Sequence, residues 1–156
     1  MAFSQTKSPY SFRAGAALSF GMSNIANNNV GLGGLIGAER RINKLFAVEA
    51  EGSYSYIIGD DVLYPEGKNK SFAIPVLAGL KLYASPNIYG SARVGAIYFL
   101  LNQISVPQVS LAYGLAGGFN FPKQNNRLNV QLGYTGFEYE SVQRGYATLA
   151  VAIIIN

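Results

Sequence analysis

The stretch FAVEAEGSYSY, from Phe46 to Tyr56, decides the fold because its side chains alternate along the chain. Phe, Val, Ala, Gly and Tyr occupy the even positions, whereas Ala, Glu and Ser occupy the odd ones. Successive side chains of a β-strand point to opposite faces, so the stretch predicts a strand with one apolar face and one polar face. The stretch FAIPVLAGLKLY, from Phe72 to Tyr83, repeats the pattern with Lys81 on the less bulky face.

The same period of two recurs outward from these stretches and predicts eight strands, at 11–21, 31–41, 45–57, 71–83, 88–100, 109–121, 127–137 and 146–155. Short connections rich in turn formers (42–44, 84–87 and 122–126) alternate with longer ones (22–30, 58–70, 102–108 and 138–145). Four consecutive hairpins of this kind predict an all-β fold, an eight-stranded antiparallel up-and-down barrel. We expect one domain over 1–156, with 1–10 as an N-terminal extension.

Composition indicates that the barrel spans a membrane. Charged residues make up 13% of the 156 residues and hydrophobic residues 49%, whereas a soluble domain has about 25% charged residues. The longest uninterrupted apolar run, 149–155, is far shorter than the ~18 residues of a transmembrane helix. A closed β-barrel is the other structure that can span a bilayer.

The chain contains no His and no Cys. Zinc sites built on these ligands, Ser-His-Asp triads and Cys-His dyads are therefore excluded. We expect no enzymatic activity, no cofactor and no metal site. A nucleic-acid groove is not predicted either, because a basic stripe with interleaved stacking aromatics is missing from the sequence.

The interior of an eight-stranded barrel is just wide enough for side chains, so the bulky apolar face is expected outside and the small or polar face inside. Charged residues on the inward face lie toward the short turns: Arg13, Glu39, Arg41, Glu49, Glu51, Lys81 and Arg93. The pair Glu49 and Glu51 could serve acid–base chemistry, but an interior ion-pair network is favoured because isolated buried charge is costly. Tyr89 and Phe99 share the face of Arg93, which leaves the orientation of that strand open.

The longest connection carries a polar and aromatic mixture suited to recognition, in Asp60, Asp61, Tyr64, Glu66, Lys68 and Lys70. A solvated cap without a partner is an equal alternative, and a divalent-cation site on its carboxylates is disfavoured. Basic residues at the short turns, Arg40, Lys44, Lys123 and Arg127, either meet anionic headgroups or are simply solvated. The glycines of 31–37 fail the dinucleotide-loop spacing and are interpreted as aids to strand coiling.

Three stretches, 72–83, Ala92-Arg93-Val94-Gly95-Ala96 and Gly114-Leu115-Ala116-Gly117-Gly118-Phe119, resemble the small outer-membrane barrels of the OmpX/OmpA-like family. The resemblance implies a bacterial outer-membrane location. Ala2-Phe3-Ser4 followed by Gln5 resembles the small-x-small end of a signal-peptide cleavage site, so we expect that a signal peptide has been trimmed; a native start at Met1 is an equal alternative. The family resemblance also implies contact with outer-membrane lipids and lipopolysaccharide, and a role in envelope integrity, adhesion or binding of another envelope or host protein. Transport of small hydrophobic molecules is the alternative. A lipid A enzyme and a soluble lipocalin-like calyx are less favoured, since His and a charged exterior are missing.

Overall fold

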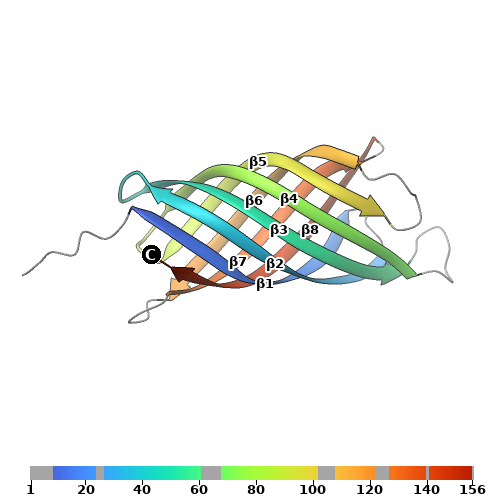
Figure 1. Cartoon of the computed structure of the whole chain (residues 1–156), viewed down its shortest axis with the longest axis horizontal. Helices are drawn as coiled ribbons and strands as arrows, with labels where there is room; N and C mark the ends of the chain where they lie inside the picture. The colour runs from blue at the N-terminus through green and yellow to red at the C-terminus, as the bar shows by residue number, and fades with distance from the viewer. Residues whose placement is uncertain are drawn as a thin grey trace, which may run out of the picture.

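The computed structural model describes residues 9–23, 27–60, 68–101, 108–121, 127–139 and 141–155. They form eight strands: β1 (Tyr10–Ser23), β2 (Asn27–Arg41), β3 (Phe46–Asp60), β4 (Lys68–Tyr83), β5 (Ile88–Leu101), β6 (Gln108–Phe121), β7 (Arg127–Tyr139) and β8 (Val142–Ile155). Each strand is antiparallel to its neighbour in the chain, and β8 pairs with β1 to close the sheet. Figure 1 shows the strands tilted across the long axis of the closed barrel. The predicted eight-stranded up-and-down barrel is confirmed.

In the described residues, we find no helix with the length and apolar character required to cross a membrane.

The two ends of the barrel differ. We call the end with the β2–β3 and β4–β5 connections, where β1 also begins, the turn end, and the opposite end the loop end (Figure 1). Most strand boundaries at the turn end match the sequence prediction within one residue, but several strands run further at the loop end. Tyr10, assigned to the N-terminal extension, begins β1, and the predicted 58–70 connection shortens to 61–67 because Ile58 and Asp60 pair with Lys70 and Lys68.

The outer wall is apolar over most of its circumference. Leu111, Val109 and Leu132 are 76%, 72% and 63% exposed, and their neighbours along each strand point inward. The predicted outward residues Phe46, Val48, Ile74, Leu80, Leu115 and Val151 are exposed as well. The predicted orientation, with the bulky apolar face outside and the charged residues inside, is therefore confirmed. In β5, whose orientation the sequence left open, Arg93 and Phe99 are both buried and so face inward.

The interior contains more bulky apolar side chains than the sequence predicted. A cluster of buried residues near the loop end, the aromatic core cluster, consists of Ile57, Ala73, Leu77, Ile97, Phe99, Ala112, Phe137, Tyr139 and Tyr146. Its rings pack closely, with the centroid of Phe99 4.9 Å from that of Phe137 and 5.2 Å from that of Tyr139. The expectation of a uniformly small, polar inward face is thus wrong for this half of the barrel, where apolar side chains fill the interior at close packing.

Candidate functional site

Five strands contribute buried charges to one cluster inside the turn-end half of the barrel. We call this group the interior ionic cluster; it consists of Arg13 (β1), Glu39 (β2), Glu49 and Glu51 (β3), Lys81 (β4) and Arg93 (β5). Five of these side chains are buried, and Glu39, nearest the turn end, is partly exposed. Strand alternation places them inside, and antiparallel pairing brings them to one level of the barrel.

The ion pairs of the cluster share partners. Arg13 Nη2 lies 2.9 Å from Glu49 Oε2 and 2.6 Å from Glu51 Oε2. Lys81 Nζ lies 2.8 Å from Glu39 Oε2 and 2.9 Å from Glu49 Oε2. Arg93 Nη1 pairs with Glu51 Oε1, and its Nε lies 3.8 Å from Glu49 Oε1. Each cation contacts two carboxylates, so the cluster is one connected unit.

The formal charges within the cluster balance. Arg13, Lys81 and Arg93 supply three positive charges, and Glu39, Glu49 and Glu51 supply three negative charges. A balanced, hydrogen-bonded group avoids most of the penalty for burying single ions. Glu49 Oε1 and Arg93 Nε nevertheless have no hydrogen-bond partner among the described atoms.

Glycines make room for these contacts. In the strand register Gly37 lies between Arg13 and Glu51 on the two flanking strands, and Gly79 lies between Glu49 and Arg93. In each case the two charged side chains approach each other across a glycine, on the inward face of the sheet, where no side chain separates them. At Gly79 the neighbouring backbone is also close: an added Cβ would overlap the carbonyl oxygen of Ala92 and lie 2.7 Å from Cα of Arg93.

We expect Gly79→Ala to lower the free energy of unfolding by about 1–3 kcal/mol, because the added methyl group overpacks this contact. The matched control is Gly90→Ala on the outer wall, where the nearest heavy atom to an added Cβ is 3.9 Å away. Urea unfolding of both variants in lipid vesicles measures the difference. Equal unfolding midpoints for the two variants would contradict the close approach at Gly79.

A second set of polar side chains extends from the ionic cluster toward the turn end. Gln131 Nε2 reaches Glu51 Oε2 at 3.4 Å, and Tyr89 OH donates to Gln131 Oε1 at 2.9 Å. Asn129 Nδ2 contacts both Tyr89 OH, at 2.9 Å, and Asn120 Oδ1, at 2.8 Å. Lys81 Nζ lies 4.2 Å from the ring centroid of Tyr89. The amides of β6 and β7 thus extend the contacts to the side of the barrel that supplies none of the charges of the interior ionic cluster.

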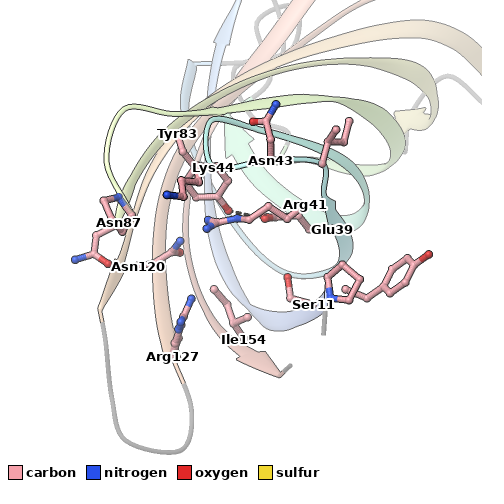
Figure 2. Close-up of a pocket in the computed structure, with 14 residues that line it drawn as sticks. Ser11, Glu39, Arg41, Asn43, Lys44, Tyr83, Asn87, Asn120, Arg127 and Ile154 are labelled. Carbon is pink, nitrogen blue, oxygen red and sulfur yellow. Dashed lines mark hydrogen bonds between the residues drawn. The ribbon is translucent and has the colours of Figure 1, made fainter. Parts of the chain in front are cut away.

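Arg41 is the one predicted member that lies outside the cluster. It ends β2 at the turn end, where its guanidinium stacks on Tyr83 with Cζ 4.0 Å from the ring centroid. Glu39, the nearest carboxylate in sequence, is occupied by Lys81 and by Tyr83 OH, which donates to Oε1 at 2.6 Å. Figure 2 shows Arg41 extending across the turn-end opening instead of down into the barrel.

The candidate recognition loop is only partly described. Asp61, Tyr64 and Glu66 lie outside the described residues. Asp60, Lys68 and Lys70 belong to the paired ends of β3 and β4, so their assignment to a connection is corrected. Backbone pairing between β3 and β4 continues through Asp60 and Lys68. The sequence here is polar at successive positions and so lacks the apolar–polar alternation that indicates a strand.

The alternation of β6 and β7 places Asn120, Asn129 and Gln131 on the inward face, but it does not predict their hydrogen bonds. The aromatic core cluster was not predicted. Asn129 and Gln131 hydrogen-bond to Tyr89, and Gln131 also hydrogen-bonds to Glu51 of the interior ionic cluster, whose formal charges balance. The arrangement is suited to joining strands and filling space, and the described residues offer no group of three or more Asp or Glu side chains that could hold a metal ion.

Comparison with known proteins identifies the fold. The chain is similar to Neisserial surface protein A (18% identity, TM-score 0.64, covering 95% of this chain and 97% of that chain). It is also similar to Ail, the attachment invasion locus protein of Yersinia pestis (17%, TM-score 0.63, 95% and 99%), which has also been solved with the heparin analogue sucrose octasulfate. The N-terminal β-barrel domain of Pseudomonas aeruginosa OprF is a more distant likeness (14%, TM-score 0.51, 93% and 97%). No family model and no curated protein matches the chain. The chain has the fold of the small outer-membrane β-barrels.

Proposed function

We propose that the chain is a non-enzymatic, integral outer-membrane protein with a plugged interior, and that it acts through its loop end or its wall. The observation that carries this proposal is the inversion of polarity: charges are buried inside, and large apolar side chains cover the outside. Such a wall would associate or aggregate in water but suits the acyl chains of outer-membrane lipids and lipopolysaccharide.

Two layers of side chains support a closed lumen. The interior ionic cluster occupies the turn-end half, and the aromatic core cluster occupies the loop-end half. Eight strands leave an interior that side chains just fill, so stacking these two layers leaves little space for water or solutes. A permeant molecule would have to displace both a balanced ion network and packed rings.

With the lumen filled, the surfaces that remain for function are the loop end and the wall. We infer that the chain acts in adhesion or in binding of another envelope or host protein, with the segment 60–70 as the principal contact. The polar and aromatic composition of that segment supports the assignment. The pairing of Asp60 with Lys68 also holds the two ends of residues 61–67 together. Ail, the attachment invasion locus protein of Yersinia pestis, has the same fold.

We expect replacement of residues 61–67 by a Gly/Ser segment of equal length to abolish crosslinking of the protein to its partner in intact outer membranes. The Asp60–Lys68 pairing is kept, so the barrel itself should fold. The same replacement of residues 102–107, also at the loop end, is the matched control and should retain the crosslinked species. Identical crosslinked species with the parent and with both variants would exclude the 61–67 segment as the recognition element.

The plugged interior is tested separately in planar bilayers. We expect the purified protein to pass no steady single-channel current, because the two interior layers block the axis. Steady conductance, or uptake of small hydrophobic molecules into liposomes, would favour the transport function over the binding function. The two experiments are independent, since a barrel can bind a partner whether or not it conducts.

A further inference from the structure

A pocket of about 580 Å³ opens at the turn end of the barrel, away from the segment that the proposed function uses. Basic side chains from three places line it: Arg41 at the end of β2, Lys44 in the β2–β3 turn and Arg127 at the start of β7. Glu39 is the one carboxylate among the described lining residues. Figure 2 shows Lys44 and Arg127 at the rim of the opening and Arg41 extending across it.

Glu39 does not neutralise these cations. Its Oε2 accepts from Lys81 Nζ at 2.8 Å, and its Oε1 accepts from Tyr83 OH at 2.6 Å, so both oxygens are engaged by other groups. Among the residues that the structure describes, none of Arg41, Lys44 and Arg127 takes part in an ion pair. With Glu39 balanced by Lys81, the described lining residues carry three positive charges in excess.

The position of Arg41 is well defined. Its guanidinium lies over the ring of Tyr83, at 4.0 Å from Cζ to the centroid, and its backbone nitrogen donates to Pro9 O at 2.9 Å. The hydroxyl of Tyr83 is in turn bound to Glu39. Arg41 also hydrogen-bonds the Tyr83 side chain. A guanidinium has five N–H donors, so those not used by Tyr83 can meet the paired oxygens of a phosphate group.

The other polar groups of the pocket add a donor. Asn120 is 4% exposed, and its Oδ1 accepts from Asn129 Nδ2 at 2.8 Å. That bond leaves the Asn120 Nδ2 group as a donor toward the pocket that it lines. Among the described lining residues, the polar groups thus include two guanidinium groups, an ammonium group and the Asn120 amide donor, and the single carboxylate is already engaged.

Strand parity separates this pocket from the lipid-facing surface. Arg40 precedes Arg41 in β2 and is exposed on the outer wall, where its Cζ lies 5.6 Å from the ring centroid of Tyr10. Arg41 faces the opening of the barrel. The two adjacent arginines therefore reach different surroundings: Arg40 meets the membrane interface, whereas Arg41 meets solutes that approach along the barrel axis.

We propose that the turn-end pocket binds a phosphate-bearing anion with at least two negative charges, held by Arg41, Lys44 and Arg127. A free phosphorylated solute and the phosphate of an anionic lipid headgroup share this chemistry. The volume of the pocket exceeds that of a single phosphate group and accommodates a diphosphate or a small phosphorylated compound. Because short turns of outer-membrane barrels lie on the periplasmic side, the pocket is open to periplasmic solutes.

The test is calorimetric titration of the whole barrel, folded in zwitterionic detergent, with inorganic pyrophosphate. We expect saturable binding that weakens as NaCl is raised, as electrostatic binding requires. Arg41→Gln and Arg127→Gln should each weaken binding about tenfold, which corresponds to about 1.4 kcal/mol. Arg40→Gln, the matched control on the outer wall, should leave the affinity within about twofold of the parent.

Two further measurements make the outcome decisive. The ¹⁵N chemical shift of Arg41 Nε in the unaltered protein should move on titration, which removes any dependence on variants that fold poorly. Nanodiscs containing phosphatidylglycerol should compete with pyrophosphate if the source is a lipid headgroup, and should have no effect if it is a free solute. No saturation up to about 10 mM pyrophosphate, or equal weakening by Arg40→Gln and Arg41→Gln, would overturn the proposal.

Discussion

Replacement of Arg93 by leucine is expected to lower the free energy of unfolding of the barrel by about 3–5 kcal/mol. Arg93 pairs with Glu51, and its Nε lies 3.8 Å from Glu49 Oε1. Without it the interior ionic cluster holds two cations against three carboxylates, so one buried negative charge lacks compensation. Urea unfolding in lipid vesicles measures the change in free energy. The loss of the β-sheet circular-dichroism signal monitors the unfolding.

A double variant distinguishes charge imbalance from lost packing. Arg93→Leu combined with Glu51→Leu leaves Arg13 and Lys81 with Glu39 and Glu49, so the charges balance again. Replacing both members of a buried ion pair by apolar groups is often neutral or stabilising, and the double variant should recover most of the loss. Arg40→Leu on the outer wall is the control and should unfold close to the parent. If Arg93→Leu unfolds at the parent's urea concentration, the cluster does not stabilise the barrel.

Placing arginine at Leu132 is expected to destabilise the membrane-inserted barrel by about 2–4 kcal/mol. Leu132 lies near the middle of β7, is 63% exposed and faces outward between Gly117 and Leu149 of the neighbouring strands. At that depth a guanidinium would be surrounded by acyl chains, whereas in water the same change would be nearly neutral. The unfolding free energy in phospholipid vesicles measures the cost.

The depth dependence provides the control for this second prediction. Ile58 lies near the loop end of β3, is 44% exposed and faces outward beside Lys70 of β4, where the bilayer interface is expected. Because the cost of an exposed arginine falls to about 0–1 kcal/mol near the interface, Ile58→Arg should change the stability little. Equal stabilities of the Leu132→Arg and Ile58→Arg variants would show that the middle of the wall does not face hydrocarbon.

The turn ends of the strands were predictable from sequence because two local signals agree there. The apolar–polar alternation is clear from the first residue of β3, Phe46, and up to the last residue of β4, Tyr83. Turn-forming residues lie just outside both positions. In the turn between β2 and β3, Asn43 Oδ1 accepts from the backbone nitrogens of Leu45 and Phe46, both at 2.8 Å. At the loop ends of β2 and β4, which begin Asn27-Asn28-Asn29 and Lys68-Asn69-Lys70, the sequence is polar at successive positions, so the pattern vanishes while backbone pairing continues.

The sequence predicts which charged residues face the interior of the barrel, but not which of them form ion pairs with each other. Parity alone places Arg13, Glu49 and Arg93 on the inward face, since a strand turns every second side chain to the same side. Which cation meets which carboxylate depends on the stagger between strands. That stagger sets Gly37 between Arg13 and Glu51 and sets Gly79 between Glu49 and Arg93, and it is a property of the closed sheet.

The sequence by itself determined the number of strands, their order, the apolar wall and the inward charges, because these depend on a period of two and on short turns. Only the tertiary structure decided that Phe99, Phe137 and Tyr146 fill one half of the lumen while the ions fill the other. It also decided that Arg41 leaves the cluster for the turn-end pocket. These features depend on contacts between distant strands and on the space left inside the barrel, which local periodicity does not encode.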